Sequence, residues 1–292
     1  MSDPRAILIA GPTAGGKSAL ALAEAEKRNG VIVNADSMQV YRDLRILTAR
    51  PSTEDEAWTQ HTLYGHVDGA ETYSVARWLE DVAGALDAAE ASGRTPVITG
   101  GTGLYFKALL EGLSPVPDIP QDIRRKWRDA AEEGGDELHV ELKTRDPAAA
   151  SQIRSSDRQR LVRALEVIDA TGQSLLEWQK VPGAPLLDAS ECHRIVVAPD
   201  REILYERCNA RFTTMFETGA IDEVRSLTAR NLSADAPIMG TLGVAPIAAM
   251  LSGAMTRDVA IARARQDTRR YAKRQLTWAR NQMSDWEWRT QL

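Results

Sequence analysis

Short apolar runs alternate with longer amphipathic segments along the first hundred residues of the chain. The apolar runs are four or five residues long, the length of buried strands. Between them lie segments rich in Ala, Leu and Glu, such as residues 19–27 and 75–91, that repeat with helical periodicity. This alternation predicts an α/β fold, a parallel sheet covered by helices on both faces. The expected strands are residues 6–10, 31–35, 63–67, 96–99 and, much later, 194–198.

The pattern changes after residue 112. Residues 114–120 contain three prolines and are unsuited to a helix or a sheet interior. Residues 121–179 then have helical, charged character, and Pro and Gly at 182–185 end them before the last strand run. We therefore predict a catalytic core of residues 1–113 and 186–292 with a helical C-terminal portion. An all-helical insertion is expected at residues 114–185.

A glycine-rich loop follows the first apolar run and precedes the first helical run. Its spacing, G-x-x-x-x-G-K-S, is that of a phosphate-binding loop (P-loop). Its backbone N–H groups and the helix N-terminus attract an anion. Lys17 would reach phosphate oxygens, and the hydroxyl of Ser18 is a candidate ligand of Mg²⁺. The sequence therefore predicts a diphosphate or triphosphate site at Gly11, Pro12, Thr13, Ala14, Gly15, Gly16, Lys17 and Ser18.

Polar residues also follow the second and fourth apolar runs, at the strand ends where parallel sheets bind ligands. Asp36 follows the second; its carboxylate could ligate a metal, act as a general base, or cap a helix N-terminus. Residues 100–105 form a second glycine-rich turn, which alone is as consistent with a tight turn as with a site. The fourth run ends in Thr99, without the acid that phosphate-loop NTPases use to position Mg²⁺.

Composition narrows the class of protein. The 292 residues are 43% hydrophobic and 26% charged, ordinary for a globular protein, and no apolar stretch approaches the roughly 20 residues of a membrane helix. The chain enters a strand at once, so no signal peptide is expected, and two cysteines without metal spacing favour a reduced, cytoplasmic setting.

Basic side chains cluster although the net charge is −5. Residues 257–289 contain nine Lys or Arg against four acids, and further clusters lie at 124–128 and 154–163. Such clusters are typical of nucleic-acid surfaces, and also of solvated helix faces. The helical run after residue 200 contains Arg201, Arg207 and Arg211. One of these arginines could reach the loop and stabilise charge on a departing diphosphate, or all three could lie on an exposed helix face.

Taken together, these motifs resemble those of the bacterial tRNA dimethylallyltransferases. The resemblance rests on residues 11–18, 35–41, 100–105, 157–166 and 268–278. It implies transfer of a dimethylallyl group from dimethylallyl diphosphate to the N6 amine of adenosine 37 in tRNA, with Mg²⁺ as cofactor and a monomeric enzyme. By position, Asp36 would be the general base, Arg211 would assist the diphosphate, and the insertion would hold the anticodon stem-loop. The implied tRNA contacts are Asp36, Ser37, Met38, Gln39, Thr102, Arg124, Gln159, Arg160, Leu161, Val162 and Arg163.

Three other functions use the same loop. A small-molecule or nucleoside kinase would transfer phosphorus, and an adenylate prenyltransferase would act on free nucleotides. The missing acid at residue 99 and the basic C-terminal run disfavour the kinase, and the arginine-rich insertion favours tRNA over a free nucleotide. An RNA-binding module with a structural nucleotide would leave Asp36 unexplained.

Overall fold

The computed structural model describes residues 3–134 and 136–290. The chain divides into two compact units, one of residues 1–110 and 186–292 and one of residues 111–185. We call them the core unit and the insertion. The first junction lies three residues earlier than expected, after residue 110 instead of residue 113. The second junction, between residues 185 and 186, lies where it was expected.

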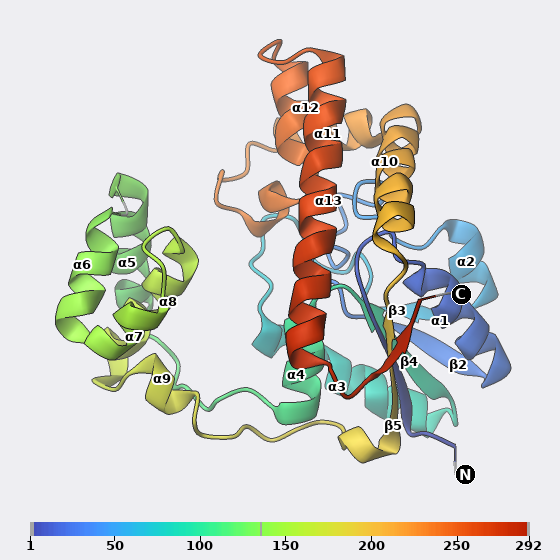
Figure 1. Cartoon of the computed structure of the whole chain (residues 1–292), viewed down its shortest axis with the longest axis horizontal. Helices are drawn as coiled ribbons and strands as arrows, with labels where there is room; N and C mark the ends of the chain where they lie inside the picture. Colours follow the sequence, from blue (N-terminus) through green and yellow to red (C-terminus); the bar gives the residue numbers. More distant parts are fainter. Residues whose placement is uncertain (1–2, 135, 291–292) are drawn as a thin grey trace. The chain divides into compact units, whose positions relative to one another are not determined.

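The core unit contains a six-stranded parallel sheet in the order β3-β2-β4-β1-β5-β6 (Figure 1). The strands are β1 (Ala6–Ala10), β2 (Gly30–Asn34), β3 (His61–Thr62), β4 (Thr95–Gly100), β5 (Cys192–Val197) and β6 (Glu287–Arg289). Four of the expected strands are thereby confirmed to within two residues at each end. The strand expected at residues 63–67 is wrong: Leu63 and Gly65 have positive φ (64° and 57°), which breaks the extended chain, and β3 lies just before them.

Helices cover both faces of the sheet because every central strand is apolar on both sides. One face, including Ile7, Ile9 and Val97, packs on α1 (Lys17–Lys27). The other face, including Leu8 and Ile98, belongs to the main core. That core includes residues of α3 (Val75–Ala91), α4 (Gly103–Glu111), α10 (Arg201–Glu217), α11 (Ala220–Ala229), α12 (Val244–Leu251) and α13 (Arg257–Gln282). The shorter elements are α2 (Thr53–Trp58), η1 (Ala189–Glu191) and η2 (Pro237–Gly240).

The insertion consists of five helices in its described part, with a separate core. That core includes Trp127, Leu142, Leu161 and Leu165. Asp169 accepts hydrogen bonds from the indole of Trp127 (3.0 Å), from Lys126 (2.8 Å) and from Arg145 (2.9 Å). The helices are α5 (Gln121–Gly134), α6 (Asp136–Arg145), α7 (Pro147–Gln152), α8 (Arg158–Thr171) and α9 (Leu175–Trp178).

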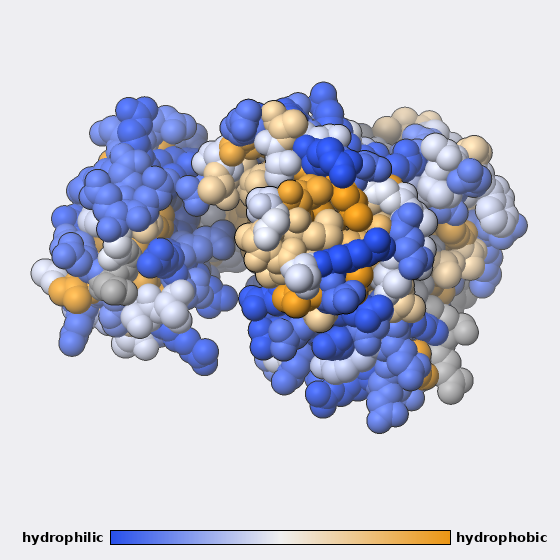
Figure 2. Space-filling view, turned by 90° about the horizontal axis from the view of Figure 1, so that it is seen from above, coloured by the Kyte–Doolittle hydropathy of each residue, from blue (hydrophilic) through white to orange (hydrophobic). Residues whose placement is uncertain are grey.

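Hydrophilic residues predominate on the face seen in Figure 2, and the largest group of apolar residues on it lies near the middle of the core unit. Among the described residues, no helix has the length and apolar character needed to cross a membrane.

Candidate active site

The glycine-rich loop between β1 and α1 has the backbone of an anion-binding turn. Gly11 and Gly16 have φ of 152° and 101°, and Gly16 is the residue from which α1 begins. A Cβ at Gly11 would lie 2.5 Å from the carbonyl oxygen of Val197, so a side chain there would collide with β5. The loop therefore needs glycine at this position for both its conformation and its packing.

Lys17 lies inside the loop. Its Nζ donates to the carbonyl oxygen of Pro12 at 2.8 Å. Burial lowers the pKa of the Lys17 ammonium to about 8, although the negative charge of Asp36 raises it and so opposes the shift. An anion bound at the loop would favour the charged form of Lys17. The ammonium would then donate to the anion instead of to the carbonyl oxygen of Pro12.

Two helices of the C-terminal portion contact the loop through Thr13. Arg211 of α10 donates to the Thr13 hydroxyl. Gln275 of α13 accepts the Thr13 backbone N–H at 2.8 Å, and donates at 2.9 Å to the carbonyl oxygen of Gly101 in the second glycine turn. The structure thus places Arg211 at the loop. It also adds Gln275, for which the sequence suggested no role although the residue lies within a segment that supports the resemblance.

Asp36 is held at the end of β2 by Asn34. The Asn34 amide donates to the carbonyl oxygens of Asp36 and Leu63, both at 3.0 Å, and its oxygen accepts the Asp36 N–H at 2.9 Å. Trp78 of α3 donates to the carbonyl oxygen of Asn34 at 2.9 Å and stacks on Tyr105, with 4.3 Å between ring centroids. The end of β2 is therefore braced by buried aromatic rings.

The carboxylate of Asp36 does not cap a helix. Its Oδ1 accepts the N–H of Met38 at 3.0 Å, two residues on, and residues 37–40 form turns instead of a helix. This contact is an Asx turn. The helix-cap interpretation is therefore wrong, and one carboxylate oxygen stays available for chemistry.

A cavity of about 430 Å³ joins these groups. Asp36 is the single acid among the described residues that line it, while Lys17, Arg207 and Arg211 supply positive charge to it. Ser18, Gln39, Tyr64 and Thr99 add polar oxygens and an amide. Its lining matches an anionic ligand bound next to a single carboxylate. The P-loop residues that line it are Thr13, Ala14, Gly15, Gly16, Lys17 and Ser18.

One wall of this cavity is a turn at residues 45–49, held at both ends by side chains. Glu223 of α11 accepts three consecutive backbone N–H groups, those of Arg45 and Ile46 at 2.7 Å and that of Leu47 at 3.0 Å. At the other end, Gln39 donates to the carbonyl oxygens of Thr48 and Ala49, at 2.8 and 2.9 Å. The amide nitrogen of Gln39 thus braces the cavity wall, while Gln39 itself still lines the cavity.

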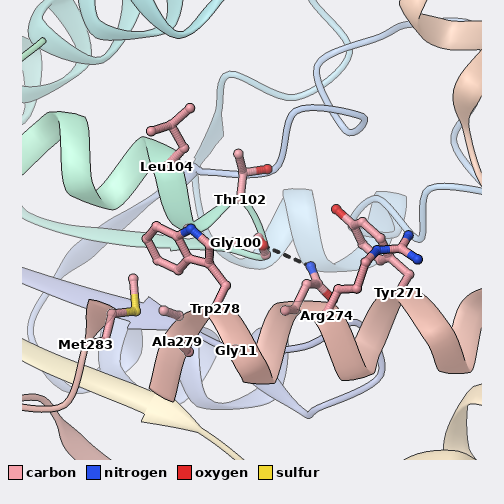
Figure 3. A pocket seen from close by; sticks show the side chains of 13 residues that line it. Gly11, Gly100, Thr102, Leu104, Tyr271, Arg274, Trp278, Ala279 and Met283 are labelled. Atoms are coloured by element: carbon pink, nitrogen blue, oxygen red, sulfur yellow. Dashed lines mark hydrogen bonds between the residues drawn. The ribbon is translucent and has the colours of Figure 1, made fainter. Parts of the chain in front are cut away.

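A second, largely apolar cavity of about 260 Å³ lies between the second glycine turn and α13 (Figure 3). Leu104, Trp278 and Met283 contribute its apolar surface, and Tyr271 and Arg274 lie along the same helix. The Gln275 to Gly101 hydrogen bond drawn in Figure 3 lies at its edge. Gly101 lines this cavity, and a Cβ at Gly101 would lie 3.3 Å from Oδ2 of Asp36. Gly101 therefore lies between this cavity and the carboxylate.

Thr102 is tied to the segment after β2. Its hydroxyl accepts the N–H of Ser37 at 3.0 Å and donates to the Ser37 hydroxyl at 3.3 Å. Ser37, Thr102 and Asp36, all expected contacts of tRNA, are therefore neighbours at the carboxyl edge of the sheet.

Two further expected tRNA contacts, Met38 and Gln39, also lie in the core unit, where Met38 is partly buried against the main core. The other expected contacts lie in the insertion. Arg124 donates to the carbonyl oxygen of Ile119 at 3.1 Å, and Gln159 and Arg160 are exposed on α8. Arg163 forms an ion pair with Glu166 at 3.6 Å. Leu161 is fully buried in the core of the insertion, and Val162 packs against that core. The side chain of Leu161 is therefore unavailable to RNA, and Leu161 could contact RNA only through its backbone.

Comparison with known proteins gives one consistent result. A family model described as IPP transferase matches residues 39–282, and a second, isopentenyl transferase, matches residues 4–64. A tRNA dimethylallyltransferase of Azorhizobium caulinodans is 55% identical over 287 residues, covering 97% of this chain and 91% of that protein. The tRNA dimethylallyltransferase of Agrobacterium fabrum is 51% identical over 281 residues, covering 96% and 94%.

Solved structures agree. The tRNA isopentenylpyrophosphate transferase of Bacillus halodurans is 33% identical, with a TM-score of 0.69 over 97% of this chain and 88% of that one. A eukaryotic dimethylallyltransferase acting on tRNA is 27% identical, with a TM-score of 0.78 over 94% of this chain and 69% of that one. With a P-loop, a carboxylate beside it and this likeness over nearly the whole length, the chain belongs to the IPP transferase family, among its tRNA dimethylallyltransferases.

Proposed function

We propose that the chain transfers the dimethylallyl group of dimethylallyl diphosphate to the N6 amine of adenosine 37 in tRNA, releasing diphosphate. The observation that supports this most strongly is the Asp36 carboxylate on the wall of the cavity that the P-loop forms. A phosphate site needs cations and N–H donors, and a carboxylate placed there repels the anion. Its presence is explained if it accepts a proton from the nucleophile.

The donor binds through its diphosphate to the P-loop, Lys17 and Arg211. These groups stabilise the negative charge that grows on the diphosphate as its bond to carbon breaks. Charge stabilisation at the leaving group serves carbon transfer as well as phosphorus transfer. The loop alone therefore does not decide which bond is broken.

Asp36 acts on the other reactant. The exocyclic amine of adenine is a weak nucleophile because its lone pair is delocalised into the ring. As the C–N bond forms, Asp36 accepts a proton from the amine, which contributes about 10²–10⁴ in rate. The adenine leaves its loop stack to reach the carboxylate, as bases do in other enzymes that modify them.

The side chains present fit a magnesium ion. Within the described residues no cluster of three His, Cys, Asp or Glu side chains could hold a metal alone. Mg²⁺ usually binds through few protein oxygens, water and substrate phosphates, and the cavity offers the hydroxyls of Ser18 and Thr99 beside Asp36. Thr99 is buried and its hydroxyl has no hydrogen-bond partner among the described residues. When bound, the ion would neutralise charge on the diphosphate.

The tRNA contacts are proposed at Asp36, Ser37, Met38, Gln39 and Thr102 of the core unit. In the insertion they are proposed at Arg124, Gln159, Arg160, Val162 and Arg163, and at the backbone of Leu161. The exposed Arg160 suits contact with phosphates, and the polar groups near Asp36 suit recognition of an unstacked base.

Mass spectrometry of the tRNA product tests the proposal. Purified protein, Mg²⁺, dimethylallyl diphosphate and an unmodified tRNA with adenosine at position 37 should add one C5H8 unit to that base. ATP and AMP serve as competing substrates in parallel reactions. Phosphoryl transfer from ATP without prenyl transfer would establish a kinase instead, and prenylation of AMP in preference to tRNA would establish an adenylate prenyltransferase.

A further inference from the structure

Thr99, the next-to-last residue of β4, has a buried hydroxyl without a partner. The residue is 5% exposed, and its Oγ1 makes no hydrogen bond within the described part of the chain. Its backbone is satisfied, since its carbonyl oxygen accepts the Ala35 N–H at 2.8 Å. By contrast, the equally buried hydroxyl of Thr268 donates to the carbonyl oxygen of Ala264 at 2.8 Å. Because buried hydroxyls are nearly always paired, that of Thr99 needs an explanation.

Thr99 faces the P-loop side of the sheet. It lines the cavity of about 430 Å³ together with Lys17, Ser18 and Asp36. It also lines a smaller void of about 20 Å³ that Ser18 and Tyr64 border. A void of that size holds about one water molecule. The hydroxyl therefore lies where a water could connect it to the group that Ser18 binds.

The position of Thr99 in the sheet adds a second argument. β4 pairs directly with the P-loop strand β1, and Thr99 is in register with Ile9. Phosphate-loop NTPases use an acid from a neighbouring strand, with the loop Ser or Thr, to hold Mg²⁺. Here the next-to-last residue of the strand, Thr99, carries a neutral hydroxyl. Among the described residues that line the cavity, Asp36, in the turn after β2, supplies the only carboxylate.

We infer that the Thr99 hydroxyl is part of the cation site: it hydrogen bonds to water bound to the Mg²⁺ that Ser18 and the diphosphate hold. This rests on the proposed function, which provides the diphosphate and the cation. A neutral hydroxyl at this place leaves Asp36 uncommitted to the metal and able to accept a proton. The hydroxyl stays unpartnered in the described part of the protein alone because its partner arrives with the ligand.

The test measures cation binding without turnover. Mn²⁺ is titrated into the whole protein with saturating inorganic diphosphate, and free Mn²⁺ is followed by electron paramagnetic resonance. Thr99→Val, which removes only the hydroxyl, should weaken Mn²⁺ binding roughly three- to ten-fold, the effect of one lost hydrogen bond. Thr99→Ser should restore it. Thr268→Val is the matched control, since it removes a buried hydroxyl away from the cavity, and it should leave Mn²⁺ affinity unchanged.

Thermal unfolding of the ligand-free variants gives an independent readout. Removing a buried hydroxyl that has no partner should leave the melting temperature of Thr99→Val equal to or above that of the unmodified protein. A lower melting temperature with unchanged Mn²⁺ affinity would overturn the inference, because the hydroxyl would then hold a structural water. Failure of the unmodified protein to bind diphosphate at all would instead contradict the proposed function.

Discussion

At the scale of single residues, the proposed chemistry depends on Asp36. Its Oδ1 accepts the Met38 N–H, and Asn34 holds its backbone on both sides. Asp36→Asn keeps an oxygen for the Met38 N–H and removes only the ability to accept a proton. We expect kcat to fall by about 10²–10⁴ while tRNA affinity changes little. Single-turnover kinetics and filter binding measure the two quantities. Loss of tRNA binding with an unchanged single-turnover rate would show that Asp36 recognises RNA instead.

Lys17 predicts a pH dependence of diphosphate binding. The pKa of Lys17 is lowered to about 8 in the free protein, and a bound diphosphate favours the charged form. Binding near pH 9 should therefore take up about one proton. Calorimetry in buffers of different ionisation enthalpy measures this uptake, and Lys17→Met should abolish most of it. An uptake that is the same in Lys17→Met would place the titrating group elsewhere.

The same shift has a consequence for stability. Between pH 8 and the ordinary pKa of 10.5, the unfolded chain holds the Lys17 proton and the folded chain releases it. The contribution of this group to the free energy of unfolding therefore rises with pH across that window. Lys17→Met should flatten this part of the pH profile in chemical denaturation.

At the scale of elements, α11 supports the cavity through Glu223 and the turn at residues 45–49. Glu223→Gln replaces a carboxylate that accepts three N–H groups by an amide that also presents donors to them. We expect the KM for dimethylallyl diphosphate to rise roughly ten-fold, since charge-assisted hydrogen bonds are lost. Asp222→Asn is the control, because Asp222 is the neighbouring residue and its side chain is exposed. This substitution should leave the KM for dimethylallyl diphosphate unchanged.

A double-mutant cycle separates positioning from general destabilisation. If Glu223 acts through the turn that Gln39 holds at its other end, then Glu223→Gln should cost much less in a Gln39→Ala background. Additive effects on KM would mean that the two side chains act independently.

Much of the fold follows from the pattern of apolar residues. The runs that became β1, β2 and β4 are continuous, apolar and buried, which is typical of strands covered on both faces. β5 is apolar and buried only in its second half, Ile195–Val197. The apolar pattern did not predict the two short edge strands. β3 has only two residues, and β6 is three residues of mixed character that pair only with β5 in the described part of the sheet. Their strand conformation depends on the neighbouring strand and leaves no signal in local sequence.

Part of the candidate site was predictable from the strand pattern. The P-loop and Asp36 follow strands, so the parallel sheet itself brings them to one edge. Gln275 and Glu223 come from helices far along the chain, and each contacts backbone groups of a turn. Such contacts are open to many side chains, and no spacing rule identifies them before the chain is folded.

At the scale of the whole molecule, the chain divides its tasks between two units. The core unit contains every described residue that lines the cavity of about 430 Å³ beside the P-loop, and the insertion presents exposed basic side chains on α8. Arg160→Ala with Arg163→Ala should raise the Kd for tRNA and reduce its salt dependence by about one unit of slope per arginine. Diphosphate affinity should not change.

Arg28→Ala, at the C-terminus of α1 and the amino end of β2, is the control and should leave tRNA binding intact. An equal loss in the control would point to a nonspecific charge effect.

The central claim is that the P-loop holds a leaving group while carbon is transferred. The most direct measurement uses dimethylallyl diphosphate carrying ¹⁸O at the oxygen that bridges carbon and phosphorus, with tRNA as acceptor. Attack at carbon breaks the C–O bond, so we predict that the label appears in the released diphosphate by mass spectrometry, together with a prenylated adenosine. Label found in dimethylallyl alcohol, with unlabelled phosphate products, would show P–O cleavage and contradict the account.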